Sequence, residues 1–427
     1  MFSDMQLATT YGASDEARHG RVALRLWFAA FFAFVLLRFA LSANILDKVV
    51  NYSADGGSIV EKIHPATYGF VAVLIGMLLT TRIELGQWEL CALRALLQLA
   101  AVILLLAVLM LLLGHTGSLG YLVDSYLAAC TGGALLLFFP QPWRQALATG
   151  LVVFIIAGAA VALGEFALRR RLLPYPLEEL TFRPTGLSEH PLVLGLFNAI
   201  AINFVAATRW RPAAKALAIL VLLLGAFAAG ARLAAMFAAL SALSVIAFHQ
   251  WPSAPPATRF RMKTLMFIGV ALAVPAAILL LFQLGLLERF QGGLFDESAM
   301  ARLNIYGLFE LVSWNEILFG ADIDYIRKLA LEHFDLQFIE SSIVMFVFQF
   351  GLFGTIVFLL VMARTFLVML SGANRHVAIG AAVFFAIAGG NNSLTTKSSI
   401  VLMIVLLIIG FHGAGAVAAG SPANSRR

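Results

Sequence analysis

Long apolar stretches alternate with short polar connections along almost the whole chain. A helix of about 20 apolar residues spans the hydrocarbon core of a bilayer, and it satisfies its own backbone hydrogen bonds where water is absent. The pattern therefore predicts an all-helical, polytopic membrane protein with about 12 transmembrane helices. The predicted spans are residues 22–43, 65–81, 94–113, 120–140, 145–168, 189–207, 213–230, 232–249, 262–284, 341–363, 375–390 and 398–417.

Two connections are much longer than the others, and the alternation of spans puts both on the same side of the membrane. Residues 169–189 contain three prolines and predict an irregular loop. Residues 285–340, between the ninth and tenth spans, are long enough to fold into a small cap. Within this cap, residues 296–312 carry apolar side chains at rough helical spacing, and residues 324–334 predict a short helix with an acidic start. Gly320 is expected to interrupt the cap between helices.

Lysines and arginines indicate the orientation. Most of those in short connections fall on the side that holds both tails, and the short connections of the other side hold only Lys48, Lys62, Arg232 and Lys397. The positive-inside rule then makes both termini cytoplasmic and places the cap outside. The chain divides into an N-terminal tail (1–21), nine spans (22–284), the cap loop (285–340), three spans (341–417) and a C-terminal tail (418–427).

Composition agrees with this class. The 427 residues are 61% hydrophobic and only 12% charged, with a mean hydropathy of +0.92, which excludes an ordinary soluble domain. The isoelectric point near 9.5 follows from the cationic cytoplasmic side and does not indicate nucleic-acid binding. The two cysteines, Cys91 and Cys130, are too few for a disulfide or metal framework.

Charged side chains at the outer ends of the spans are the candidates for chemistry. Glu340 precedes the tenth span and Arg232 begins the eighth. Because a charge held where lipid meets water is costly, its presence there suggests a function. Arg302 lies in the cap loop, and His190 lies in the loop that enters the sixth span. The further candidates are Arg289 as a phosphate contact, Glu189 and Lys397.

Each of these residues also has a structural interpretation. Arg232 can extend to the lipid headgroups, and Arg302 can pair with acidic neighbours in a cap that carries ten acidic and four basic residues. Glu340 can interact with the dipole of the tenth span, with Ser341 as its cap. His190 can be a helix-entry residue bonded to the backbone. Both interpretations stay open for each residue.

Three further charges fall inside predicted spans, near the outer face. Arg38 can reach the outer interface or pair with Asp47, and a structural role is favoured. Asp124 and Glu165 can line a cavity, or they can bond each other or nearby arginines.

Three stretches of the chain, in order and at plausible spacing, resemble a known superfamily. Residues 186–195 read GLSEHPLVLG, residues 230–232 read Gly-Ala-Arg, and residues 302–320 lead into residues 340–354. Together they resemble the O-antigen ligases and Wzy-type polysaccharide polymerases of bacterial envelopes, over roughly residues 180–365. The ligases carry a histidine eleven residues before a glycine; here Glu340 stands at that position, with Gly351 eleven residues on. A carboxylate there is more similar to the polymerases.

The resemblance implies a multi-pass protein of the bacterial inner membrane whose cap lies in the periplasm. It implies a metal-independent glycosyltransferase, without cofactor, that joins polyprenyl-diphosphate-linked oligosaccharide repeats into an exopolysaccharide or O-polysaccharide. Arg232, Arg302 and Arg289 would hold the diphosphate, because guanidinium stays charged and binds phosphate bidentately. Glu340 or His190 would activate the acceptor hydroxyl. Membrane lipid, a chain-length regulator and export proteins are the other partners implied.

Two alternatives stay open. A ligase would transfer finished polysaccharide to a lipid or protein acceptor, and the sequence does not identify the acceptor. A flippase or transporter would carry charges at the centres of several spans and show repeat symmetry. The nearly uncharged centres of the spans favour chemistry at the outer surface.

Overall fold

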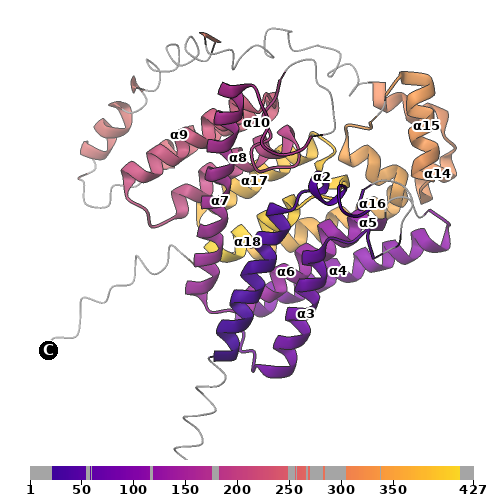
Figure 1. Cartoon of the computed structure of the whole chain (residues 1–427), viewed down its shortest axis with the longest axis horizontal. Coiled ribbons are helices and arrows are strands. Elements are labelled where there is room, and N and C mark those ends of the chain that lie inside the picture. The colour runs from indigo at the N-terminus through magenta and orange to yellow at the C-terminus, as the bar shows by residue number, and fades with distance from the viewer. Residues whose placement is uncertain are drawn as a thin grey trace, which may run out of the picture.

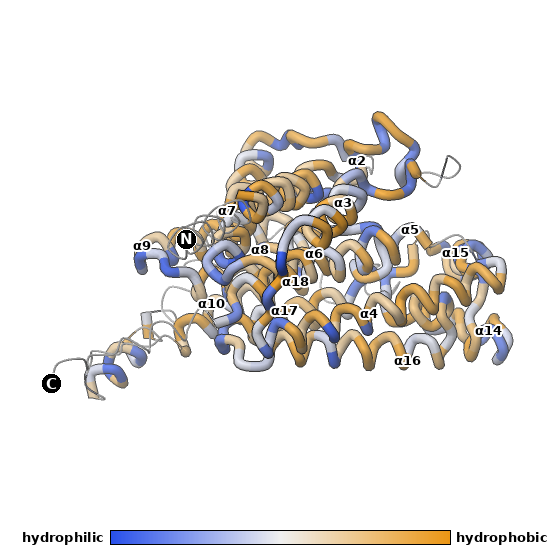
Figure 2. The backbone as a smooth tube through the Cα atoms, turned by 90° about the horizontal axis from the view of Figure 1, so that it is seen from below, coloured by the Kyte–Doolittle hydropathy of each residue, from blue (hydrophilic) through white to orange (hydrophobic). Residues whose placement is uncertain are grey.

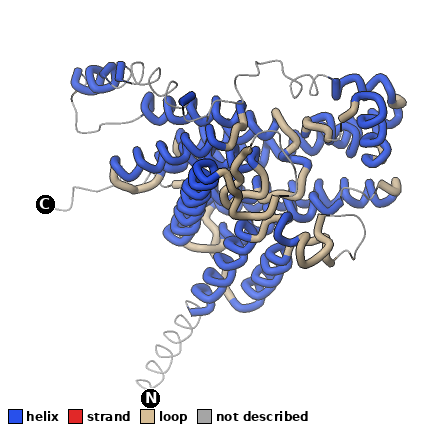
Figure 3. The backbone as a smooth tube through the Cα atoms, turned by 45° about the horizontal axis from the view of Figure 1, so that its top comes forward, coloured by secondary structure: helices blue, strands red, loops and turns tan. Residues whose placement is uncertain are grey.

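The computed structural model describes residues 22–53, 58, 60–115, 119–175, 182–248, 255, 257–265, 268–269, 282–283, 304–336 and 338–413. These residues form helices, turns and loops without any β-strand (Figure 3). After a first helix, Val22–Ala40, the main helices are α2 (Ala43–Leu46), α3 (Pro65–Thr80), α4 (Gln87–Leu112), α5 (Leu119–Tyr121), a π-helical turn (Leu122–Leu127), α6 (Ala128–Leu137), α7 (Gln141–Leu168), α8 (Pro191–Ala207), α9 (Pro212–Ala228), α10 (Arg232–Phe248), α13 (Leu308–Leu311), α14 (Trp314–Phe319), α15 (Ile323–Phe334), α16 (Ser342–Leu370), α17 (Arg375–Gly389) and α18 (Ile400–Phe411).

The predicted all-helical fold is confirmed for the described residues, and their long apolar helices are compatible with the predicted membrane class. Helices fall within eleven of the twelve predicted spans, while the ninth, residues 262–284, lies largely outside the described residues. Among the described residues, five helices are long and apolar enough to cross a membrane: Val22–Ala40, Gln87–Leu112, Leu119–Leu137, Gln141–Leu168 and Ser342–Leu370. The number of twelve spans stays a prediction, since the other apolar helices in the described ranges are shorter, at 10–17 residues.

Successive helices run in alternate directions, so the bundle has two ends. At the Glu340 end, where α8, α10, α16 and α18 begin, the Ser342 N–H donates to the carbonyl of Asn391 at 3.0 Å. At the Arg144 end, where α7 and α9 begin, the Arg144 guanidinium pairs with Glu89 at 2.7 Å. There His412, just after α18, stacks on Trp88 with ring centroids 3.5 Å apart. Polar groups thus tie the helices together at each end.

Helix α8 packs among α7, α9, α10 and α17, and α18 packs mainly against α6 and α7 (Figure 1). All twelve residues of α18 are buried, and so are most residues of α8. Apolar side chains on the outside of the bundle, such as Leu104, Leu105 and Leu112 of α4, stay exposed, as expected for a surface that faces lipid (Figure 2).

The described part of the cap is helical. The predicted helix at residues 324–334 is confirmed as α15, whose N-cap residue Asp322 accepts the Asp324 N–H at 3.0 Å. Of the helix predicted at residues 296–312, residues 304–311 form a 3₁₀ turn and α13, which ends before Val312, and residues 296–303 lie outside the described residues. Figure 1 shows α14 and α15 on the opposite side of the molecule from α9.

The cap joins α16 through two glycines with positive φ. Gly320, which ends α14 as predicted, has φ 97°, and Gly351 inside α16 has φ 71°. A Cβ on Gly351 would lie 2.3 Å from the carbonyl oxygen of Leu318. Beside this contact, the Ala321 N–H donates to the carbonyl of Phe348 at 2.6 Å. Because neither glycine carries a side chain, the backbone of the cap docks directly against the backbone of α16.

Helix lengths explain why α16 bends at Gly351. Residues 352–370 rise about 28 Å at 1.5 Å per residue, whereas the 15 residues of α17 rise about 22 Å. Both helices leave the short turn between Leu370 and Arg375, yet Ser342 meets Asn391 beyond the far end of α17. The first part of α16 must therefore turn back towards α17, and the glycine allows it.

We expect Gly351→Ala to release the cap from α16. The backbone conformation of Gly351 (φ 71°, ψ 168°) is essentially restricted to glycine, and forcing alanine into it costs about 1–3 kcal/mol before the clash with Leu318 is counted. The purified variant should melt at a lower temperature, and its cap should be cut faster by protease. Gly164→Ala in α7, where a Cβ meets nothing within 4 Å, is the control and should not lower the melting temperature. Equal behaviour of the two variants would contradict this account of the junction.

Candidate functional site

A cluster of polar and charged side chains lies at the Glu340 end, between the first helix, α3, the π-helical turn and the loops before α8 and α18. Its centre is Asp124, a fully buried residue in the π-helical turn Leu122–Leu127. The carboxylate of Asp124 accepts hydrogen bonds from the hydroxyl of Tyr52 at 2.9 Å, the hydroxyl of Thr67 at 2.8 Å and the backbone N–H of His64 at 3.0 Å. The carboxylate therefore joins the π-helical turn to Tyr52 and to the start of α3. These bonds supply the partners that a buried carboxylate needs.

His64 caps α3 in a fixed tautomer. Its Nδ1 accepts the Ala66 N–H at 3.1 Å, so the proton belongs on Nε2, which donates to the Leu41 carbonyl at 3.0 Å. Burial, and secondly the positive charge of Arg38, lower the pKa of the imidazole from 6.5 to about 4. His64 is therefore neutral at physiological pH.

Lys397 binds the same cluster from the loop before α18. Its ammonium donates to the carbonyls of Tyr52 at 2.8 Å and Lys62 at 3.1 Å, and it lies 4.7 Å from the centroid of the Tyr52 ring. Burial is the main cause that lowers the pKa of Lys397. These contacts tie two loops together, and the predicted contact of Lys397 with substrate stays a prediction.

Arg38 lies near the C-terminal end of the first helix with only 3% of its surface exposed. Its hydrogen bond to the backbone carbonyl of Asp124 is long, 3.5 Å from Nη2, and its Nε has no partner among the described residues. The suggested pair with Asp47 is not formed, because the Asp47 carboxylate binds the Ser53 backbone N–H at 2.7 Å and the Ser53 hydroxyl.

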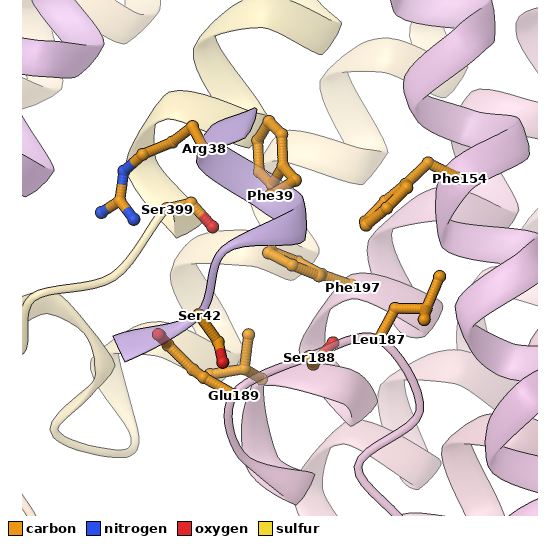
Figure 4. Close-up of a pocket in the computed structure, with 10 residues that line it drawn as sticks. Arg38, Phe39, Ser42, Phe154, Leu187, Ser188, Glu189, Phe197 and Ser399 are labelled. Atoms are coloured by element: carbon orange, nitrogen blue, oxygen red, sulfur yellow. The ribbon is translucent and has the colours of Figure 1, made fainter. Parts of the chain in front are cut away.

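A small cavity lies beside Arg38 (Figure 4). Its polar lining residues are Arg38, Ser42, Ser188, Glu189 and Ser399, and its aromatic lining residues are Phe39, Phe154 and Phe197. Figure 4 shows that Arg38 and Glu189 reach this cavity from two different segments, the first helix and the loop before α8. Burial raises the pKa of Glu189, and Arg38 opposes this shift. A guanidinium, a carboxyl group and three hydroxyls beside phenylalanine rings can hold a small polar group.

His190 is the N-cap residue of α8. Its Nδ1 accepts the Leu192 N–H at 3.1 Å. This bond matches the structural interpretation of His190, a residue at the start of a helix that bonds to the backbone. The Tyr175 ring lies 5.7 Å away between centroids. This capping bond engages Nδ1, so any role as a base would fall to Nε2.

Arg232 and Glu340 both lie next to the end of α17. Arg232 is half-buried at the start of α10, where its neighbour Leu233 packs against Gly390. Glu340 is also half-buried and comes two residues before Ser342, whose hydroxyl donates to the carbonyl of Asn391 at 2.6 Å. As predicted, Ser341 caps α16, by accepting the Val344 N–H. The fold therefore brings the neighbourhoods of these two candidates to one turn of the chain. Arg302 and Arg289 lie outside the described residues.

Sequence reasoning singled out Asp124, the centre of the polar cluster, but it overlooked the partners of this residue. Tyr52, His64 and Thr67 were not singled out, although the rarity of a charge such as Asp124 within a span was a signal that partners must exist. Glu165 was considered for a cavity, but it is buried and accepts the backbone N–H groups of Leu172, Thr185 and Gly186, so it holds the loop before α8.

No protein-family model, curated protein or solved structure matches this chain. Within the described residues, no group of three or more histidine, cysteine, aspartate or glutamate side chains is arranged to hold a metal ion.

We expect Asp124→Ala to destabilise the protein strongly. The change leaves the hydroxyls of Tyr52 and Thr67 and the N–H of His64 without their acceptor, at about 1–3 kcal/mol for each buried donor. Thermal unfolding of the purified protein should start at a clearly lower temperature. Asp47→Ala is the matched control, because Asp47 is exposed and binds only within its own loop. If both variants melt alike, Asp124 is not the tie that we describe.

Stability should fall as the pH drops from about 6.5 to about 4. The folded protein holds the pKa of His64 at about 4, so protonation disfavours the folded state and removes stability that is fully present above pH 6.5. At pH 4.5 the loss should be about 2–3 kcal/mol from this residue. His64→Asn keeps a capping side chain but cannot titrate, so its melting temperature should fall less between pH 7 and pH 4.5. An unchanged pH dependence in this variant would refute the assignment.

Proposed function

We propose that this protein transfers a glycan from a polyprenyl diphosphate to an acceptor hydroxyl at the Glu340 end, and that it joins repeats into a polysaccharide. The observation that supports this proposal is the placement of Arg232 and Glu340 beside the same end of α17, through the Leu233–Gly390 and Ser342–Asn391 contacts. A cation and a carboxylate then lie on the two sides of one polar turn in an otherwise apolar bundle.

The cationic side of this site suits a diphosphate leaving group. Negative charge grows on the diphosphate as the glycosidic bond breaks, and a preorganised arginine stabilises it by several kcal/mol where water is scarce. Helices α8, α10 and α16 all begin at this end, so the positive ends of their helix dipoles add positive potential. Arg302 and Arg289 from the cap would complete the cationic side.

The carboxylate side suits activation of the acceptor. Glu340 lies directly before the capped start of α16, and its half-buried position gives it access to an incoming hydroxyl while limiting competing water. In the reaction, the acceptor oxygen bonds to the anomeric carbon, the bond to diphosphate breaks, and the hydroxyl proton passes to Glu340. His190 is the alternative base, through Nε2.

The acceptor separates the proposed polymerase from its alternative, a ligase. A polymerase uses a second lipid-linked repeat, and a ligase uses a different lipid or a protein. A flippase is a less suitable proposal, because the charged candidates gather at one end of the bundle, and neither α8 nor α18 carries a charged side chain.

We expect Arg232→Ala and Arg302→Ala to abolish long polymer. Loss of a preorganised cation at the leaving group should slow transfer by at least about 100-fold. The measurement is incubation of the purified protein with synthetic polyprenyl-diphosphate repeats, followed by separation of the products by length. Glu340→Gln should likewise reduce the rate by about 100-fold or more.

Arg211→Ala is the control for these variants. Arg211 is an exposed arginine that caps α9 at the Arg144 end, so its removal should leave product length unchanged. Melting temperature and membrane insertion of each variant must match the wild type. Normal polymer from both Arg232→Ala and Arg302→Ala would end the proposal.

A further inference from the structure

Two aromatic side chains at the ends of α14 are unusually exposed for their size. Trp314 is 76% exposed and Phe319 is 59% exposed. The Phe319 ring nevertheless has one neighbour, Phe353 of α16, with centroids 6.0 Å apart. Phe353 is itself 58% exposed, so the pair forms a continuous apolar surface that runs from α14 onto α16.

The surface of α16 changes character at Gly351. Before it, residues 342–351 are buried by the protein, with Ile343 as the exception. After it, one side of the helix is exposed and apolar, at Leu352, Phe353, Ile356, Val357 and Leu360. An exposed apolar row on a helix long enough to cross a bilayer is a surface that contacts lipid. Contact with lipid therefore begins directly after Gly351.

The length of the remaining helix agrees with this boundary. Residues 352–370 rise about 28 Å, which matches the hydrocarbon thickness of about 30 Å. Gly351 then stands at the level where the hydrocarbon ends on the side of the cap. The backbone contacts of Gly320 with Gln349 and Gly351 hold the end of α14 at the same level.

The side chains of α14 suit a position at the membrane–water interface, and the charged side chains of α15 do not. The one charged side chain of α14, Glu316, is engaged in a capping box with Ser313. The exposed side of α15 instead carries Asp324, Arg327 and Lys328, which face water readily. Tryptophan and other aromatic residues are enriched where a membrane meets water.

We propose that α14 lies in the membrane interface of the leaflet at the Glu340 end, where Trp314 and Phe319 anchor the cap to lipid. The ligand of this surface is the bilayer itself, at the junction of headgroups and acyl chains. The cap is then held by two attachments, the glycine contact with α16 and the aromatic contact with lipid. This inference does not depend on the proposed transferase activity.

Nitroxide accessibility tests the proposal. Single cysteines replace Phe319 or, as the control on α15, Lys328, in a chain that carries Cys91→Ser and Cys130→Ala. Each labelled protein is reconstituted in vesicles of phosphatidylcholine and phosphatidylglycerol. We expect the label at 319 to be relaxed by oxygen, which dissolves in lipid, and shielded from a water-soluble nickel chelate. The label at 328 should show the reverse.

Quenching of tryptophan fluorescence tests the same surface with Phe319 intact. The wild-type protein and Trp314→Phe are placed in the same vesicles with brominated acyl chains, and the difference between them reports on Trp314. We expect the Trp314 component to lose more than half of its intensity to brominated lipid.

Each other outcome overturns the proposal. Equal access of the nickel chelate to positions 319 and 328 would place α14 in water. Shielding of position 319 from both oxygen and the chelate would show that another protein segment or a second copy covers α14. Failure of brominated lipid to quench the Trp314 component would exclude lipid contact at that end of the helix.

Discussion

The architecture depends on the need to satisfy every polar group that the bundle takes away from water. At the Glu340 end this need is concentrated on the Asp124 carboxylate, which gathers donors from Tyr52, His64 and Thr67. The π-helical turn that carries Asp124 lies between α5 and α6, and Ser125 in the same turn donates to the carbonyl of Thr396 at 2.8 Å. The loops at this end are therefore fixed by hydrogen bonds that would each be costly to leave unmade.

That rigid set of loops determines where the reactive candidates can lie. Helices α8, α10, α16 and α18 begin from it, so His190, Arg232 and Glu340 are placed by backbone caps and close helix contacts and do not depend on flexible connections. The cavity between Arg38 and Glu189 belongs to the same region. Arg38 is buried there, and burial raises the pKa of Glu189, a combination that is typical of functional sites.

The cap is attached to α16 mainly by contact between the two backbones, and not by charged side chains. The glycine pair Gly320 and Gly351 lets two chain segments approach more closely than any side chain would allow, and a small apolar cluster that includes Ile305, Ile326 and Phe348 fills the space beside them. The bend at Gly351 returns the start of α16 to the end of α17. Glu340 thus reaches the neighbourhood of Arg232 because a helix bends more than ten residues away.

Apolar runs of helical length predict the class of protein and the positions of most helices, because such runs have few alternatives in lipid. Local residue patterns also predict α15 and the capping role of Ser341. They do not reveal the Asp124 network, since Asp124 lies 57 to 72 residues along the chain from Tyr52, His64 and Thr67, and no pattern links it to them. Nor do they reveal that Gly351 contacts Leu318, because a glycine within an apolar run has no signature of what approaches it. These partners follow from the three-dimensional packing, since they depend on which helix ends meet and how closely the backbones approach.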